Sequence, residues 1–292
     1  MELGSKFQSS KLGAKAKKSL GEVVSVKYHD IFDYPLTDLE MFKWTAGPKT
    51  TTGVSRVETG SKLGFNFVSG KSASVFKRLL RKRISARKMR LARKAADVIA
   101  LIPTVKMVGI TGALAMENAT KESDIDLITI TKQNTLWLTR LATMVLLKVA
   151  GIKTRRFGDK NEEDKLCLNM WLDETDLIFR KRNVYTAHEL AQIVPLVNKD
   201  GTYEMFIEKN NWIKDYWPNA IRGANFSRST KKGHASIKVL SKISDLVLKP
   251  LELLSWKLQL WYMNKKITRE VVTKTRELSH PYDWGAFVTK KL

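Results

Sequence analysis

Two aspartates at the start of one apolar segment constrain this chain more than any other feature. The segment Ile125–Thr131 is β-branched at most positions, which predicts a strand, and Asp124 and Asp126 stand on either side of its first residue. Side chains at positions i and i+2 of a strand project from the same face. The two carboxylates are therefore expected to point the same way, while Ile125 and Leu127 point into the core.

The segment that precedes this pair leads into a glycine turn. Val105–Thr111 is short and mostly apolar, which predicts a strand, and Gly112 follows it 12 residues before Asp124. A glycine lets backbone N–H groups approach a phosphate closely, because it has no side chain. Two desolvated carboxylates repel each other unless a cation lies between them. Mg²⁺ takes a few carboxylates together with phosphate oxygens, so the pattern predicts a magnesium site that binds a phosphate.

The aspartate pair alone also has a simpler interpretation. Asp124 is then a solvent-exposed loop residue, and Asp126 pairs with a nearby Lys or Arg. The strand and the glycine turn that precede the pair make the full pattern much more specific than an isolated Asp-x-Asp.

The full pattern resembles the core of the polymerase-beta-type nucleotidyltransferase superfamily. The motif of that superfamily is an apolar residue, Gly, then Gly or Ser, a short spacer, and an apolar-flanked Asp-x-Asp or Asp-x-Glu pair. By this resemblance Gly112 and Ala113 fall on the turn, and Asp124 and Asp126 fall on the metal-binding pair. A group of bacterial nucleotidyltransferase-domain proteins is similar over nearly the whole chain, including the segments Asp30–Thr37 and Leu136–Arg140.

The resemblance implies a reaction and a set of site residues. The reaction is transfer of a nucleoside monophosphate from an NTP to an acceptor hydroxyl, with Mg²⁺ or Mn²⁺ as cofactor. Asp124 and Asp126 would be the catalytic metal ligands. The residues expected to bind the nucleotide are Thr111, Gly112, Ala113 and Ser123.

The chain departs from the superfamily pattern in two places. Ala113 replaces Gly or Ser, so a hydroxyl that touches the triphosphate is absent. The third carboxylate is not obvious: on the predicted strand Lys165–Leu172, Asn169 stands at the expected place, and Asp173 is the acid on the same face. An Asn is no base, and general-base assistance is worth about 10²–10⁴-fold. Asp173 is the predicted third catalytic residue; the alternative function is a catalytically weak regulator that binds nucleic acid or nucleotide.

The remaining sequence predicts an α/β (α+β) protein with a small mixed central sheet. Thr37 and Glu40 form a capping-box pattern, and a hairpin is expected around Thr59-Gly60-Ser61. A long basic helix is expected over Ser72–Ile102. The predicted parts are a flexible basic arm (1–19), a winged-helix-like module (20–71), the nucleotidyltransferase core (72–182) and a helical C-terminal region (183–292).

The charge balance favours a polyanionic partner. Lys and Arg number 52 against 29 Asp and Glu, which gives a formal net charge of +23. Such a charge attracts nucleic acid, nucleotide or an anionic membrane, and RNA is one candidate acceptor. A solvated helix face is the other interpretation of the basic run. The basic positions expected to bind are Lys11, Lys15, Lys17 and Lys18 in the arm and Arg81, Lys82, Arg83, Arg87, Lys88 and Arg90 in the long helix.

Cysteine content and hydropathy limit the cellular compartment and the kind of membrane association that we expect. Cys167 is the only cysteine, which excludes a disulfide within the chain and a Cys-based zinc site and favours a reducing, cytoplasmic setting. No apolar stretch reaches the roughly 20 residues of a transmembrane helix. The segment with Trp256, Trp261 and Tyr262 predicts a buried helix-bundle face, and a membrane-docking helix is the alternative.

Overall fold

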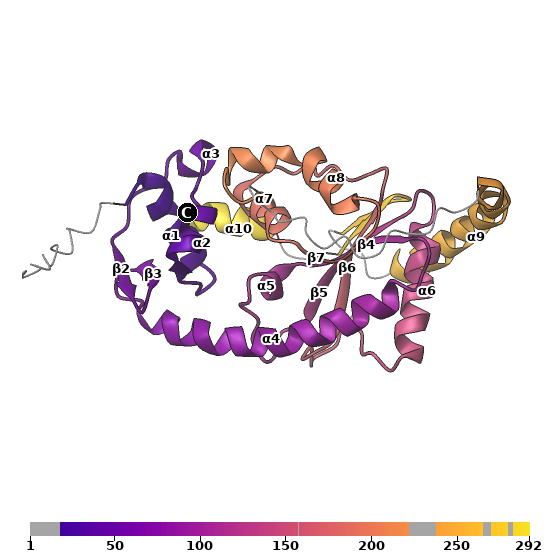
Figure 1. Ribbon diagram of the computed structural model, residues 1–292, viewed down its shortest axis with the longest axis horizontal. Helices are drawn as coiled ribbons and strands as arrows, with labels where there is room; N and C mark the ends of the chain where they lie inside the picture. The colour runs from indigo at the N-terminus through magenta and orange to yellow at the C-terminus, as the bar shows by residue number, and fades with distance from the viewer. Residues whose placement is uncertain (1–17, 157, 222–237, 265–269, 280–282) are drawn as a thin grey trace, which may run out of the picture.

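The computed structural model describes residues 18–156, 158–221, 238–264, 270–279 and 283–292 (Figure 1). They form a mixed α/β structure, as the sequence predicts. The helices are α1 (Leu20–Asp30), α2 (Asp38–Lys43), α3 (Pro48–Thr51), α4 (Ala73–Ile99), α5 (Gly112–Ala115), α6 (Leu136–Val149), α7 (Val184–Ala191), α8 (Thr202–Lys209), the 3₁₀ helix η1 (Asn211–Asp215), α9 (Lys238–Asn264) and α10 (Trp284–Lys291). In this part of the chain no helix is both long enough and apolar enough to cross a bilayer.

A mixed six-stranded sheet lies at the centre of the molecule, with the strand order β7-β4-β5-β6-β9-β8. Among the described strands of this sheet, β5 and β6 pair in parallel and the other neighbours are antiparallel. The predicted strands around the aspartate pair are confirmed within one residue. The strands of this sheet are β4 (Val105–Ile110), β5 (Ile125–Thr131), β6 (Leu166–Asp173), β7 (Val194–Asn198), β8 (Val271–Val272) and β9 (Arg276–Leu278).

Each face of the sheet packs against its own set of helices. On one face Ile125 and Leu127 are fully buried against small residues of α4 such as Ala95. On the other face Ile128 and Met170 belong to one hydrophobic cluster with residues of α7, α8 and α1. Figure 1 shows α4 running along one side of the molecule from the N-terminal segment to the sheet. Since Asp126 and Ile128 are two residues apart in β5, the Asp126 carboxylate emerges on the α7 side.

The C-terminal part is not all-helical, contrary to the sequence prediction. β7, β8 and β9 all lie within residues 183–292 and pair into the central sheet. The predicted helix over 187–197 ends at Ala191, and the chain then enters β7 beside β4. Pro195 is tolerated there because β7 is an edge strand, which pairs with β4 on one side alone and has an irregular register beside Pro195. In α9, Trp256 packs against the core, whereas Trp261 and Tyr262 are exposed.

The N-terminal segment forms a second sheet of three strands, ordered β1-β3-β2. Its strands are β1 (Leu36–Thr37), β2 (Thr59–Lys62) and β3 (Phe65–Val68). The predicted capping box of Thr37 and Glu40 is confirmed at the start of α2. The hairpin turn lies later than predicted, at Leu63 and Gly64, whose φ angles are 52° and 77°. Left-handed conformations at both central residues are those of a type I′ turn, which matches the twist of paired strands.

A buried histidine pair joins this N-terminal segment to α7. The Nε2 atoms of His29 and His188 lie 3.0 Å apart, and the Trp44 ring stacks on His188 at a centroid distance of 3.9 Å. Burial lowers the pKa of His29 to about 4 against weaker opposing contributions from Ser25 and Glu40. Burial is also the main cause that lowers the pKa of His188, and repulsion from His29 and Lys43 lowers it further. Both imidazoles are therefore neutral in the folded protein at neutral pH.

The histidine pair is expected to make the protein sensitive to mild acid. The folded-state pKa lies below the unfolded value for both His29 and His188, so their stabilising contribution is full above pH 6.5 and is lost as pH falls below it, for His29 down to about pH 4. Two such groups change the free energy of unfolding by up to about 2.7 kcal/mol per pH unit. Denaturant unfolding of the wild type and of His29→Phe across this range checks the expectation. An equally steep loss in both would assign the acid sensitivity to other groups.

Candidate active site

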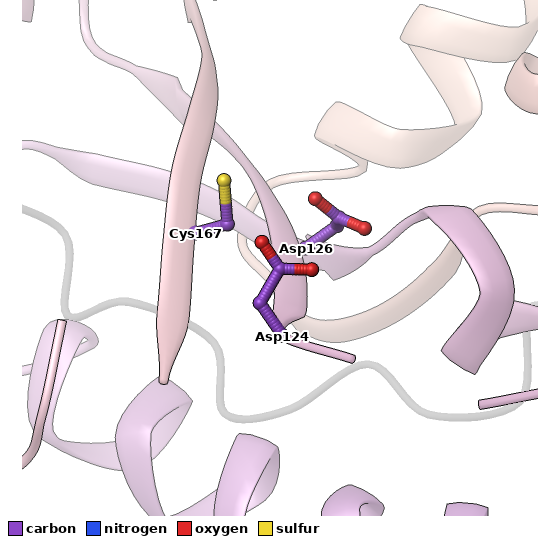
Figure 2. A group of neighbouring side chains, drawn as sticks. All are labelled: Asp124, Asp126 and Cys167. Atoms are coloured by element: carbon purple, nitrogen blue, oxygen red, sulfur yellow. The ribbon is translucent and has the colours of Figure 1, made fainter. Parts of the chain in front are cut away.

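The two predicted aspartates lie together at the start of β5 (Figure 2). Ligand atoms of Asp124, Asp126 and Cys167 all lie within 4.8 Å of one another. Cys167 reaches the pair because β6 runs parallel to β5 with Cys167 opposite Asp126. The two carboxylates project to the same side, as their spacing predicts, whereas Ile125 and Leu127 are buried on the opposite face.

Gly112 is fitted against the Asp126 carboxylate. Its φ angle is +60°, and a Cβ at this position would overlap Oδ2 of Asp126. The preceding residue is tied to the same place, since the Thr111 N–H donates to the carbonyl oxygen of Asp126 at 3.1 Å. Any side chain on Gly112 would therefore displace the carboxylate as well as strain the backbone.

Gly112→Ala is expected to reduce both stability and cation binding. The left-handed backbone costs about 1–3 kcal/mol for a residue with a Cβ, and the contact with Asp126 adds to it. Gly151→Ala is the matched control, because Gly151 has φ +69° and open space around its missing Cβ. Denaturant unfolding and Mn²⁺ titration of both variants separate the two contributions. If the two variants lose the same stability and both keep cation binding, the contact with Asp126 is irrelevant.

Burial and mutual repulsion control the charge of the pair. Burial is the main cause that raises the pKa of Asp126 to about 7, and repulsion from Asp124 is the second. The nearby Arg155 lowers this pKa. Arg155 donates to Asp124 at 2.8 Å and is 39% exposed. Burial and the two carboxylates also raise the pKa of the Cys167 thiol, so the sulfur stays protonated. The available ligands are thus oxygen atoms, which Mg²⁺ prefers over sulfur.

The amide of Asn169 completes this oxygen-rich surface. Its Nδ2 donates to Asp126 Oδ1 at 2.7 Å, and the side chain is only 5% exposed. Its Oδ1 is buried and has no hydrogen-bond partner among the described residues. A buried acceptor without a partner costs about 1–3 kcal/mol, which a bound cation would offset. The residues that could hold a metal ion are therefore Asp124, Asp126 and Asn169.

A third carboxylate reaches the site from α7. The Gln192 amide donates to Glu189 Oε1 at 2.7 Å and to the Gly112 carbonyl at 3.3 Å. Burial raises the pKa of Glu189 to about 8, with Asp126 as the second cause. Sequence reasoning missed Glu189 because it assigned this helix to an all-helical C-terminal region, separate from the nucleotidyltransferase core. The available signal was a single acid within the otherwise neutral α7.

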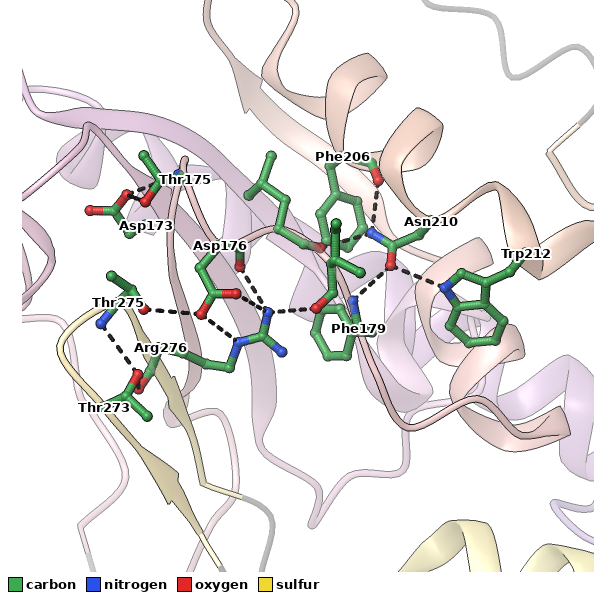
Figure 3. A network of polar contacts seen from close by, with 12 residues as sticks. Asp173, Thr175, Asp176, Phe179, Phe206, Asn210, Trp212, Thr273, Thr275 and Arg276 are labelled. Carbon is green, nitrogen blue, oxygen red and sulfur yellow. Dashed lines mark hydrogen bonds and ion pairs between the residues drawn. The ribbon is translucent and has the colours of Figure 1, made fainter.

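Asp173 does not reach the cluster, contrary to the sequence prediction. It lies at the far end of β6, opposite Thr131, six positions or about 20 Å along the strand from Cys167. Its carboxylate accepts hydrogen bonds from both the N–H and the hydroxyl of Thr175 (Figure 3). It also accepts one from the Asn134 N–H at 2.6 Å. The side chain is 1% exposed, and these contacts hold the turns that follow β5 and β6.

The predicted nucleotide-binding residues divide into two groups. Thr111, Gly112 and Ala113 lie at the cluster, where β4 gives way to α5. The Ser123 hydroxyl instead donates to the Thr120 carbonyl within its own loop at 3.0 Å. Comparisons of the chain with protein-family models, with curated proteins and with solved structures found no match.

Proposed function

We propose that this chain is a Mg²⁺-dependent nucleotidyltransferase that moves a nucleoside monophosphate from an NTP to an acceptor hydroxyl. One observation carries the proposal: Asp124 and Asp126 project together beside Gly112. The Asn169 amide supplies independent support: its nitrogen bonds Asp126, and its oxygen is buried without a hydrogen-bond partner among the described residues, a need that a cation would meet. Two carboxylates on one strand face, next to a glycine turn, suit a metal ion that is shared with phosphate oxygens.

The residues around the pair have distinct parts in this proposal. A divalent cation held by Asp124, Asp126 and Asn169 would supply positive charge to the triphosphate. Such a cation competes with Arg155 for Asp124, and the displaced guanidinium has the donors to bind a phosphate oxygen. The absent side chain of Gly112 lets the Asp126 carboxylate lie directly against the turn that would receive the phosphate.

Label transfer from each α-labelled NTP is the direct test. The protein is incubated with Mg²⁺ or Mn²⁺ and a pool of acceptors, including RNA, proteins, sugars and small alcohols. Transfer of label to one acceptor class identifies both the donor and the acceptor. If Mn²⁺ binds but no label leaves any NTP, the chain is not a nucleotidyltransferase toward these acceptors, and the binding function below becomes the better account.

The second candidate function is a catalytically weak regulator that binds nucleic acid. It is favoured by exposed cations of α4 that have no ion-pair partner in the described part of the chain, namely Arg83, Arg90, Arg93 and Lys94. The element order α1-β1-α2-α3-β2-β3 next to this helix is compatible with a winged-helix-like module. Other positions that were predicted to bind a polyanion make contacts within the protein. Lys18 donates to Asn66 and Arg81 to Asn118. Arg87 donates to Asp164 and Lys88 to the Ser123 carbonyl. Lys11, Lys15 and Lys17 lie outside the described residues.

Binding of RNA is expected to be electrostatic and insensitive to sequence. Reversing the charge of Arg83, Arg90 and Arg93 to Glu should weaken all RNA sequences about equally. It should also flatten the log–log salt slope by about 0.7–0.9 for each phosphate that the protein no longer neutralises. The control reverses Lys209, Lys214 and Lys290, which are exposed on other helices and change the net charge equally. Equal weakening by both triple variants would assign binding to net charge rather than to α4.

A further inference from the structure

A cavity of about 670 Å³ opens next to Glu189, on the α7 side of the sheet. Its walls come from β6, the segment that follows it, α7, the β8–β9 hairpin and the start of α10. The volume lies within the range of about 300–1,000 Å³ that is typical of small-molecule sites. Glu189 lines this wall, and Gln192 also connects it to Gly112, which lies against Asp126. The cavity is therefore close to the proposed metal-binding carboxylates.

The wall of the cavity is mainly apolar and aromatic. Tyr185 and Trp284 stack at a centroid distance of 6.3 Å, and Met170 and Leu278 close the side formed by the sheet. Hydroxyl groups are contributed by Thr186 of α7 and by the β8–β9 hairpin. Such a wall binds an apolar or aromatic body and orients it with a few polar contacts.

The charged residues of the wall largely neutralise one another. Arg276 pairs with Asp176 at 2.8 Å, and Figure 3 shows the Asp176 carboxylate also accepting from Thr275. Lys181 pairs with Asp283, likewise at 2.8 Å. Arg180 is the third basic residue of the wall and Glu189 is the third acid, so the cavity lacks the large excess of positive charge that a polyanion such as RNA requires. A small neutral or weakly charged molecule fits it better.

Glu189 connects this cavity to the aspartate pair. Gln192 holds its carboxylate by donating to Oε1, and the same amide nitrogen reaches the Gly112 carbonyl. Tyr185 lies one helical turn before Glu189 on the same face of α7, which is the face that lines the cavity. A molecule in the cavity is therefore next to Glu189, which Gln192 connects to Gly112.

We propose that the cavity binds the acceptor, a small alcohol or phenol with an apolar or aromatic body, and that Glu189 receives its proton. This inference rests on the proposed nucleotidyl transfer. The acceptor oxygen forms a bond to the α-phosphorus of the NTP, and the bond from that phosphorus to the pyrophosphate oxygen breaks. Pyrophosphate leaves with the electron pair, and the hydroxyl proton passes to a carboxylate oxygen of Glu189.

Binding to the cavity is tested without any nucleotide. The probe is 4-fluorobenzyl alcohol, whose ¹⁹F line broadens when it binds the full-length protein. Thr186→Trp fills the cavity and should abolish the broadening, whereas Ala286→Trp places the same side chain on an exposed position of α10 and should not. Absence of broadening with the wild type, or equal broadening in both variants, would overturn the assignment of the cavity. These outcomes do not depend on whether the protein transfers nucleotides.

The part assigned to Glu189 is tested by label transfer to a panel of aromatic alcohols and phenols. Glu189→Gln should retain Mn²⁺ binding and probe broadening, yet lose at least about 10²-fold in transfer, together with the rise of the rate with pH that a general base produces as it loses its proton. Glu189→Asp should recover part of the rate. Unchanged transfer in Glu189→Gln or in Thr186→Trp would refute the proposal. If the wild type transfers no label while the probe still binds, the proposed reaction fails and the cavity stands as a binding site alone.

Discussion

Asp126→Asn is expected to lower nucleotidyl transfer by at least about 10²-fold, because it removes one of the two charges that would hold the metal ion. The fold should survive the change. Burial and Asp124 already raise the pKa of Asp126 to about 7, so the folded protein tolerates the uncharged acid, which an amide imitates. Three measurements check this expectation. Transfer from the labelled NTP gives the rate, thermal unfolding with and without Mn²⁺ gives the stability, and Mn²⁺ titration gives the affinity for the metal.

Asp173→Asn is the matched control for this experiment. It makes the same chemical change in a buried carboxylate of β6 that accepts hydrogen bonds from Asn134 and Thr175 rather than facing the cluster. We expect lower stability, with the rate per folded molecule and the affinity for Mn²⁺ unchanged. Near-normal transfer in Asp126→Asn, or a large loss in Asp173→Asn without unfolding, would move the chemistry away from the start of β5.

The strands that carry the aspartate pair were predictable because local patterning decides them. β5 begins and ends where the β-branched run does, and the i, i+2 spacing alone puts Asp124 and Asp126 on one side. Which residue approaches that pair from elsewhere is a tertiary question. Glu189 reaches it through β7, which brings α7 back beside β4, and β7 itself was mistaken for the end of a helix.

The sequence was also misleading about the Lys and Arg residues of α4, because some of them are exposed and others are buried. The basic run of α4 looks uniform along the sequence, yet its members divide between solvent and interior. Arg83 and Arg90 are exposed, whereas Lys88 is fully buried two residues before Arg90. Helical periodicity indicates which positions face inward, but a lysine at such a position is ordinarily assigned to the surface. Lys88 remains inside because it has acceptors there.

Lys88→Met is expected to lower the free energy of unfolding by about 3 kcal/mol, the lower end of the range for breaking a buried ion pair by removing one partner. The Lys88 ammonium donates to Asp164 at 2.8 Å and to the carbonyl oxygens of Lys121 and Ser123 at 3.0 Å and 2.7 Å. Methionine fills similar space and satisfies none of these acceptors. The loss stays near 3 kcal/mol because Asp164 is 24% exposed and keeps its pairing with Arg87.

Lys94→Met makes the same substitution at an exposed position of α4 and should change stability by no more than about 0.5 kcal/mol. Denaturant unfolding of both variants measures the difference. Because two of the three acceptors of Lys88 lie in the loop that ends at Asp124, the variant should also weaken Mn²⁺ binding by the protein that remains folded. Equal stability of the two variants would show that the ammonium of Lys88 is solvated. Weaker Mn²⁺ binding in Lys88→Met, with normal binding in Lys94→Met, is the expected result and would identify α4 as the element that holds Asp124 in place.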